Sequence, residues 1–357
     1  MCGIVGFTGA AQAAPILLDG LAKLEYRGYD SAGLAVQKMA DINARLQDSL
    51  GGIRVVKSKG RLAELRKKLE LQALAESGCG IGHTRWATHG EPSVVNAHPH
   101  YSNDKKIAIV HNGIIENYLE IKERLTNKGF TFVSQTDTEV LAQLLDYYYM
   151  GESAGDPLDA IARTMLHVRG SYALGVLFAD EPGTIYAARK DSPLIVGKSD
   201  NGSFIASDVP AILKYTRTVY YVDNQEVVEL QQGSLRFFSV DEEEIEKQPV
   251  TIDWDANAAE KAGYEHFMMK EIHEQPKAVS DTINSVVKDG KIDLSGVGMD
   301  EETIRNISQI YIVACGSAYH VGMAAQYVLE DLARIPVRVE LASEFRYRNP
   351  ILDKNGL

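Results

Sequence analysis

Cysteine is scarce in this chain, whose 357 residues include only Cys2, Cys79 and Cys315. Three widely spaced thiols provide neither a disulfide framework nor the paired ligands of a structural zinc site. Because thiols stay reduced inside cells, the sequence predicts a cytoplasmic protein without disulfide bonds.

Positive charge and long apolar segments are also in short supply. The chain has 37 Lys and Arg residues against 49 Asp and Glu residues, which gives a formal net charge of -12. This balance argues against nucleic acid or an anionic membrane surface as the main partner. No apolar run reaches the roughly 18 residues that a membrane-spanning helix needs. The first residues also lack the basic segment and apolar core of a signal peptide.

The pattern of strands and helices predicts two domains, as the length of the chain does. Residues 1–240 begin with short buried strands and several helices, including those over Pro15–Tyr26 and Asn117–Asn127. From Ser171 onward strand follows strand, separated by turns that contain Gly or Asp. Clustered strands and helices, without alternating βαβ units, predict an α+β domain of antiparallel sheets covered by helices.

Residues 241–290 are predicted to be a linker and a helix, beginning with the charged run Asp241–Glu244. The helical pattern covers Tyr264–Asp289, and Gln275-Pro276 suggests a helix start within it. Residues 291–357 then show a strand, a helix and a second strand, which is the opening of a parallel α/β domain. Two parallel strands bury too little to be stable alone, so we expect this domain to be incomplete.

Cys2 is the first candidate for chemistry, because removal of Met1 would leave its thiol and a free α-amino group on one residue. An α-amino group has a pKa near ~7.7–8.0 and can serve as a base near neutral pH. A thiol with a pKa of about 8.5 gains nucleophilicity from such a base. Taken alone, Cys2 could equally be an inert cysteine buried at the start of a strand.

The residues around Cys2 and several later motifs resemble one family. The motifs are Cys2–Gly6, Leu24–Gly33, Gly82–Gly90, His111–Ile115, Ser134–Glu139 and Ala342–Arg346. They resemble the class II glutamine amidotransferases, which are N-terminal-nucleophile (Ntn) hydrolases, and among these the glutamine–fructose-6-phosphate aminotransferases (isomerizing), or glucosamine-6-phosphate synthases. The resemblance implies a four-layer αββα Ntn-hydrolase domain over residues 1–240. Residues 291–357 would then be the start of an α/β sugar isomerase (SIS) domain.

The resemblance also implies roles for residues of the glutamine site. Cys2 would be the nucleophile, and Asn112 and Gly113 would supply the side-chain and backbone N–H groups of an oxyanion hole. Arg85 would bind the substrate α-carboxylate, and Asp137 the α-ammonium group. From the residues alone, Asn112-Gly113 could be a simple turn, Arg85 a surface ion pair and Asp137 a helix cap.

Four further residues receive weaker assignments from the same motifs. Thr88 and His89 match a loop that contacts glutamine, and Trp86 matches a tryptophan that gates the passage of ammonia. Packing of Trp86 in a core remains an alternative. Arg27 lies in a motif near the nucleophile and is expected to support its surroundings.

Cys315-Gly316-Ser317 lies between a strand and a helix, a layout in which backbone N–H groups can hold an anion. A generic packing turn is the alternative. The resemblance implies that this turn contacts a sugar phosphate. Ala318 departs from the family by lacking a hydroxyl group, so one polar contact is in doubt.

The histidines at positions 83, 89, 98, 100 and 111 fit no common zinc-site spacing, so the sequence predicts no metal and no cofactor. The expected ligands are L-glutamine and, for the full-length enzyme, D-fructose 6-phosphate, with a homodimer as the assembly. Two other functions are considered. One is another class II amidotransferase, such as the purine-pathway enzyme that uses phosphoribosyl pyrophosphate, and the other is a non-catalytic sugar-phosphate sensor.

Overall fold

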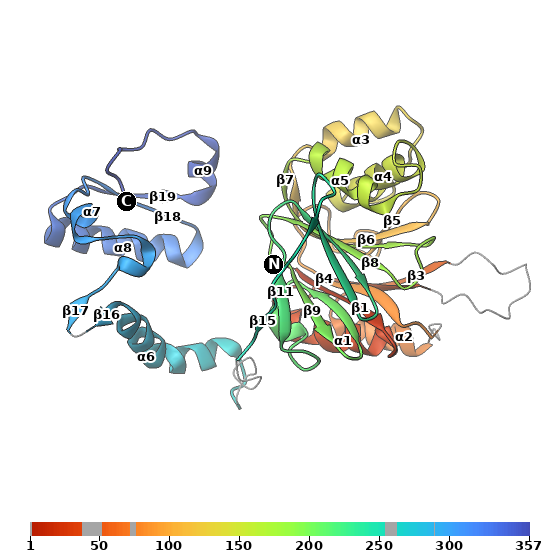
Figure 1. The fold of residues 1–357 in the computed structure, drawn as a ribbon, viewed down its shortest axis with the longest axis horizontal. Coiled ribbons are helices and arrows are strands. Elements are labelled where there is room, and N and C mark those ends of the chain that lie inside the picture. The colour runs from red at the N-terminus through yellow and green to blue at the C-terminus, as the bar shows by residue number, and fades with distance from the viewer. Residues whose placement is uncertain (1, 38–51, 72–75, 254–262, 289) are drawn as a thin grey trace, which may run out of the picture. The chain divides into compact units, whose positions relative to one another are not determined.

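The computed structural model describes residues 2–37, 52–71, 76–253, 263–288 and 290–357. The chain divides into two compact units, Met1–Glu260 and Lys261–Leu357 (Figure 1). The first unit continues beyond residue 240, where the sequence placed a linker, because β14 (Glu244–Ile245) and β15 (Val250–Thr251) pair with its sheets. No helix in the described ranges is long and apolar enough to cross a membrane.

Two antiparallel sheets form the middle of the first unit. The eight-stranded sheet begins with β15 at one edge. Its further strands are, in order, β11 (Thr218–Tyr221), β9 (Ile195–Ser199), β10 (Gly202–Ala206), β1 (Gly3–Gly9), β4 (Cys79–Arg85), β2 (Ser31–Gln37) and β3 (Ile53–Lys59). The seven-stranded sheet begins with β14 at one edge. Its further strands are, in order, β13 (Ser234–Ser239), β12 (Glu226–Gln231), β8 (Ile185–Lys190), β7 (Gly170–Phe178), β6 (Ile107–Ile115) and β5 (His100–Tyr101). A core that includes Ile4, Ile81, Val110 and Ala173 fills the space between the sheets.

Helices cover the outer face of each sheet (Figure 1). α1 (Ala13–Leu24) and α2 (Leu62–Leu71) pack on the first sheet, and Leu17 and Leu21 of α1 are completely buried there. The other sheet is covered by three helices, α3 (Tyr118–Thr126), α4 (Asp137–Met150) and α5 (Pro157–His167). The predicted four-layer αββα arrangement of antiparallel sheets between helices is thus confirmed.

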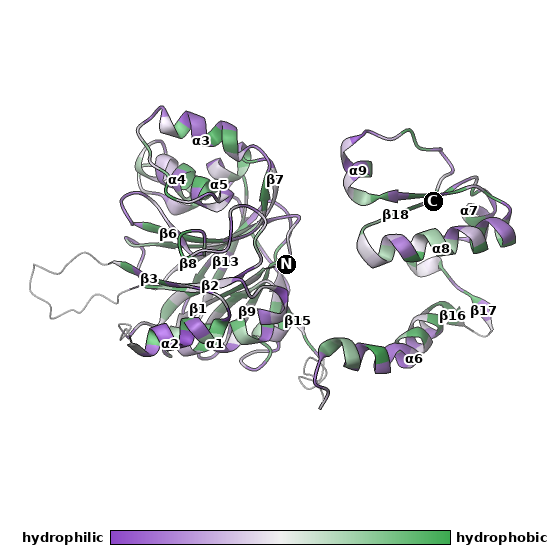
Figure 2. Ribbon diagram, turned by 180° about the vertical axis from the view of Figure 1, so that it is seen from behind, coloured by the Kyte–Doolittle hydropathy of each residue, from purple (hydrophilic) through white to green (hydrophobic). Residues whose placement is uncertain are grey.

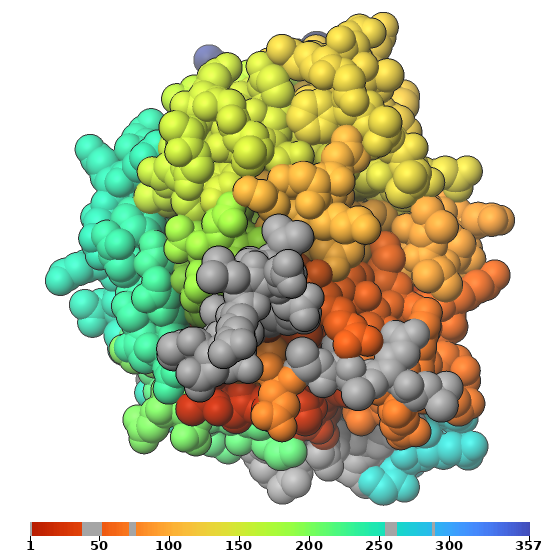
Figure 3. Space-filling model, turned by 90° about the vertical axis from the view of Figure 1, so that its right-hand side faces the viewer, coloured from red at the N-terminus to blue at the C-terminus, as the bar shows by residue number. Residues whose placement is uncertain are grey.

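The layers are also visible from other sides of the molecule. Figure 2 shows hydrophobic residues along the strands of the first unit and mixed polar and apolar residues along α1 and α2. In Figure 3 the segment that contains α3 forms the upper part of the face, and the N-terminal segment lies toward the bottom. The candidate site lies where the start of β1 and the end of β4 in one sheet meet β6 of the other sheet.

Local sequence signals explain where the helices begin. The hydroxyl of Thr136 accepts the N–H of Glu139, which provides the N-terminal cap of α4. Asp156 caps α5 ahead of Pro157, which occupies the first helical turn. α1 is followed by the short 3-10 helix η1 (Glu25–Arg27), so the helical conformation ends close to the predicted end at Tyr26.

The second unit contains a long helix, a parallel strand pair and short elements. α6 (Phe267–Val286) runs through Pro276, so the expected helix start at Gln275-Pro276 is wrong. β18 (Ile310–Ala314) and β19 (Val337–Leu341) are parallel and joined by α8 (Gly316–Ala333), which confirms the predicted α/β opening. The remaining elements are β16 (Val287–Lys288), β17 (Lys291–Ile292), the 3-10 helix η4 (Ser295–Val297), α7 (Glu301–Arg305) and α9 (Ala342–Tyr347).

Candidate active site

Cys2 lies directly before β1, the strand that runs between β4 and β10 in the first sheet. The start of β1 is held from the side, because Ile4 N–H donates to Ser207 Oγ over 3.0 Å and Ser207 N–H donates to Ile4 O over 3.0 Å. Cys2 is half-buried and lines a cavity of about 300 Å³. It is therefore a positioned, accessible thiol, unlike the inert buried cysteine considered from sequence.

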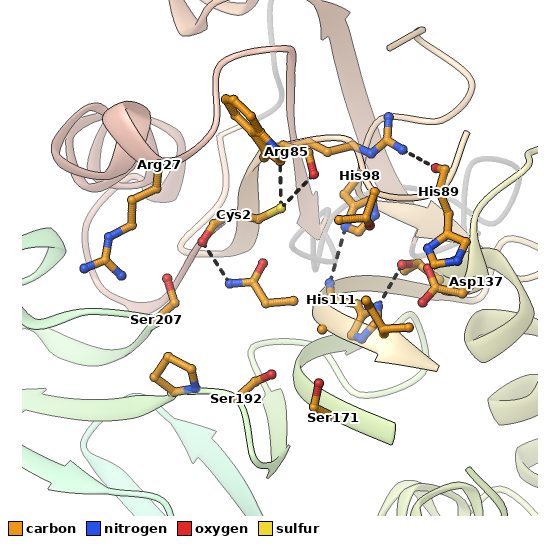
Figure 4. Close-up of a pocket in the computed structure, with 17 residues that line it drawn as sticks. Cys2, Arg27, Arg85, His89, His98, His111, Asp137, Ser171, Ser192 and Ser207 are labelled. Carbon is orange, nitrogen blue, oxygen red and sulfur yellow. Dashed lines mark hydrogen bonds between the residues drawn. The ribbon is translucent and has the colours of Figure 1, made fainter. Parts of the chain in front are cut away.

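The thiol of Cys2 faces a backbone donor. Trp86 N–H donates to Cys2 Sγ over 3.2 Å (Figure 4). Burial raises the pKa of the Cys2 thiol, and the contact with the Trp86 backbone opposes that effect in part. The thiol is therefore protonated at neutral pH, and its use as a nucleophile requires a base that removes the proton during attack.

Asn112 and Gly113 lie within β6 and do not form the turn that was the alternative. Asn112 Nδ2 donates to Cys2 O over 3.0 Å, while His83 Nε2 lies 2.9 Å from Asn112 Oδ1. Gly113 has a φ of +130°, and a Cβ atom there would lie 2.0 Å from Ser171 O. Only glycine fits this position, so the backbone approaches the cavity beside Cys2 without a side chain.

Arg85, the last residue of β4, is 3% exposed and is not a surface ion pair. Its guanidinium donates to the carbonyl of Gly90 over 3.0 Å, to that of Glu91 over 3.5 Å, and to that of His89. These bonds fold the following loop around the guanidinium. A cation held in this way at a cavity wall suits the binding of a carboxylate.

Asp137 is the first residue of α4 and lines the same cavity. The N-terminal cap is Thr136, so capping is not the function of the Asp137 side chain. One carboxylate oxygen, Oδ2, accepts the N–H of Ile115 over 2.9 Å. The carboxylate is thus fixed in direction, with its charge at the cavity that Arg85 also lines.

The residues with weaker assignments also reach the cavity: Arg27, Trp86, Thr88 and His89 line it. Trp86 is 47% exposed and makes an edge-on contact with Tyr29, with ring centroids 5.3 Å apart. Its interpretation as a core residue is therefore wrong. Arg27 forms an ion pair with Asp208, which lies next to Ser207.

Four histidines near Cys2 and Asn112 are buried, and of these His98 and His111 line the cavity; the four are His83, His98, His100 and His111. Burial lowers the pKa of His83 to about 3 and lowers those of the other three as well. These imidazoles are neutral, and their hydrogen bonds, such as His111 Nδ1 to Thr138 Oγ1 at 2.9 Å, serve to build the site. Among the described residues, no group of three His, Cys, Asp or Glu side chains is arranged to hold a metal.

Several wall residues were not recognised from the sequence. They are Ser171, Ser192 and Ser207 (Figure 4), together with Pro193, Ile114 and Thr138. Ser192 and Ser207 come from the strand-rich part of the unit, far from every motif. Only the pairing of β10 with β1 brings Ser207 to Cys2, so the local sequence carried no signal for it.

Cys315, Gly316 and Ser317 belong to the second unit. Cys315 is the N-terminal cap residue of α8 and is exposed, and Gly316 and Ser317 begin the helix. Their predicted role at a sugar phosphate stays a prediction.

Comparison with known proteins identifies the family. Residues 70–248 match the family of glutamine amidotransferase domains, and residues 303–357 match the SIS domain family. The glutamine–fructose-6-phosphate aminotransferase (isomerizing) of Clostridium acetobutylicum is 55% identical over 100% of this chain and 56% of its own length. The enzyme of the same name from Methanosarcina acetivorans is 44% identical over 100% of this chain and 57% of its own length. The chain thus spans little more than half the length of these curated relatives.

Solved structures support the fold. The glutamine phosphoribosylpyrophosphate amidotransferase of B. subtilis has a TM-score of 0.54 at 19% identity, covering 95% of this chain and 65% of its own. The allosteric regulatory enzyme of purine biosynthesis has a TM-score of 0.55 at 24% identity, covering 67% of this chain and 49% of its own. The chain belongs to the glutamine amidotransferase domain family, and the predicted relationship to glutamine–fructose-6-phosphate aminotransferases is confirmed.

Proposed function

We propose that the first unit hydrolyses L-glutamine to glutamate and ammonia, with Cys2 as the nucleophile. The observation that carries this proposal is the meeting of Cys2, Asn112, Arg85 and Asp137 at one cavity of about 300 Å³. The cavity combines a thiol, an amide donor, a cation and an anion. L-glutamine carries the matching groups, which are an amide at one end and a carboxylate and an ammonium group at the other.

The reaction begins when the α-amino group of Cys2, free after removal of Met1, takes the thiol proton. The sulfur attacks the side-chain amide carbon of glutamine, and the oxyanion that forms accepts hydrogen bonds from Asn112 Nδ2 and Gly113 N–H. The same amine returns its proton to the departing nitrogen, which leaves as ammonia. Water then hydrolyses the γ-glutamyl thioester, which releases glutamate and restores the thiol.

The raised pKa of the Cys2 thiol means that attack requires a base, and the α-amino group on the same residue can supply it. The four buried histidines are unsuited to this task, because burial lowers their pKa values and they cannot hold a proton at neutral pH. Arg85 would bind the α-carboxylate and Asp137 the α-ammonium group. Thr88 and His89 would contact the substrate, Trp86 would gate ammonia, and Arg27 would support the surroundings of Cys2.

For the longer protein we propose that the ammonia converts D-fructose 6-phosphate to D-glucosamine 6-phosphate. The names of the relatives and the SIS match over residues 303–357 support this step. Cys315, Gly316 and Ser317 would contribute to the sugar-phosphate site, and a cytoplasmic homodimer is part of the proposal. The 357-residue chain assayed alone should release ammonia without forming the amino sugar, because the described part of its second unit has one pair of parallel strands, β18 and β19, and no larger parallel sheet.

The test is the release of glutamate and ammonia from L-glutamine by protein whose intact mass shows that Met1 is gone. Cys2→Ala should reduce turnover at least ~10³-fold, because Cys2 is the one cysteine among the described residues that line the cavity. Cys79→Ala, at a buried cysteine of the same sheet, is the matched control and should keep its activity. Normal turnover by Cys2→Ala would refute the mechanism.

A further inference from the structure

A buried side chain outside the cavity wall connects the two charged groups of the site. Asn96 is 3% exposed and lies on the segment between β4 and β5, and it is not among the residues that line the cavity. Its amide contacts the loop that wraps Arg85 on one side and the residues before Asp137 on the other. Each of these contacts can be followed atom by atom.

On the loop side, Asn96 Nδ2 donates to Glu91 O over 2.9 Å. That carbonyl also accepts Arg85 Nη1 over 3.5 Å, so Asn96 and the guanidinium share one acceptor. The loop passes close to the amide at Gly90, where φ is +74° and a Cβ atom would lie 2.7 Å from Asn96 Nδ2. The position of the Asn96 amide and the path of the loop around Arg85 therefore depend on each other.

On the helix side, the N–H of Gln135 donates to Asn96 Oδ1 over 3.0 Å, and Asn96 Nδ2 lies 3.3 Å from Gln135 Oε1. Gln135 directly precedes Thr136, whose hydroxyl caps α4, and Asp137, whose carboxylate lines the cavity. Hydrogen bonds thus run from Arg85 through Glu91 O and Asn96 to the peptide next to the Asp137 helix. Loss of the amide would leave Gln135 N–H and Glu91 O each without one partner.

We propose that Asn96 is a positioning residue that fixes the distance between Arg85 and Asp137. This inference rests on the proposed function, in which the two side chains bind the α-carboxylate and the α-ammonium group of one substrate. Both groups are attached to the same carbon atom of an α-amino acid, so their binding partners must be held at one fixed separation. Asn96 would therefore select ligands that carry both charges over ligands that carry only one.

The experiment compares Asn96→Ala with the parent chain in glutamine hydrolysis and in inhibition by L-glutamate and by glutarate, which lacks the ammonium group. We expect KM for glutamine and the inhibition constant of L-glutamate to rise about tenfold, with kcat changed less than about threefold. The inhibition constant of glutarate should change little, because glutarate does not use Asp137. Alkylation of Cys2 by iodoacetamide should keep the parent rate, which a general loss of structure would not allow.

Asn117→Ala is the matched control, because Asn117 also joins two segments by donating to His167 O and accepting Arg169 N–H, both over 2.9 Å. It should leave KM unchanged. If Asn96→Ala does not fold, Gln135→Ala is tested instead. Gln135 is exposed, and loss of its side chain removes one hydrogen-bond contact of the Asn96 amide. KM for glutamine should then rise about two- to threefold.

For Asn96→Ala, an unchanged KM for glutamine, or an equal rise in the inhibition constants of L-glutamate and glutarate, would overturn the positioning role. For Gln135→Ala, an unchanged KM for glutamine would overturn it. Failure of the parent chain itself to hydrolyse glutamine would instead overturn the proposed function.

Discussion

Each unit has a cysteine directly next to a strand, but the surroundings of the two cysteines differ. Cys2 precedes β1, which has a strand on each side and is buried over most of its length. Cys315 follows β18, which pairs with β19 and, through Tyr311 N–H, with Leu357 O, and which is half-buried or exposed along its length. The neighbours of β1 also carry Arg85 and Ser207, which complete the surroundings of the thiol. Neighbouring strands on both sides of β1 thus place the groups around Cys2, and among the described residues no such sheet surrounds Cys315.

The largest effect among residues other than the nucleophile is expected at Asn112. Its Nδ2 group lies at the Cys2 end of the cavity, and its Oδ1 atom faces His83. Asn112→Ala should lower kcat for glutamine hydrolysis about 10²- to 10³-fold, because one oxyanion donor is lost. Steady-state ammonia release measures this change.

A control from the other unit sharpens the comparison. Asn306→Ala removes an exposed amide at the end of α7 and should leave the rate unchanged. Equal rates for Asn112→Ala and the parent would mean that the oxyanion is stabilised elsewhere.

A core substitution tests the difference in packing between the units. Leu21 of α1 is completely buried, whereas Leu332 of α8 is 77% exposed. Leu21→Ala should lower the free energy of unfolding of the first unit by about 2–5 kcal/mol, and Leu332→Ala should change stability by less than about 0.5 kcal/mol. Urea denaturation followed by circular dichroism measures both. A larger loss for Leu332→Ala would show that α8 is covered in solution.

The sequence predicted elements well where a local signal was strong. Thr136 with Glu139 three residues later, and Asp156 directly before Pro157, are local signals of helix starts, and α4 and α5 begin there because caps are decided by a few adjacent residues. Pro276 gave a wrong helix start, because a proline is also compatible with a continuing helix when its environment tolerates the lost hydrogen bond. α2 was not predicted at all, although Leu62, Leu65 and Leu69 recur at helical spacing, because the charged residues between them make the segment polar overall.

The residues of the site, too, were predicted where a local motif marked them. Motifs around Cys2, Arg85, Asn112 and Asp137 named residues that the structure brings to one cavity. Ser207 and the neutral state of His83 could not be predicted, because both depend on which strands become neighbours. Asn96 lies four residues before His100 in a segment without regular structure, and only its three-dimensional contacts reveal its place between two motifs.

A pH dependence of stability should also belong to the first unit. Burial lowers the pKa of His83 to about 3, and those of His98 and His100 also lie well below the usual 6.5. Below pH about 6.5 these histidines bind protons in the unfolded chain but stay neutral when folded, so stability falls as the pH falls. Each buried histidine contributes a slope of about 1.4 kcal/mol per pH unit.

Asp146 acts in the opposite direction, because burial raises the pKa of its carboxyl from 3.8 to about 7. Between these values the folded state holds the extra proton, so Asp146 offsets the slope of one histidine. Urea denaturation at pH 5, 6 and 7 should therefore show lower stability at pH 5 in the parent chain. His83→Gln should flatten this dependence and Asp146→Asn should steepen it. Equal stability at all three pH values, unaffected by either substitution, would mean that water reaches the buried histidines in the folded protein.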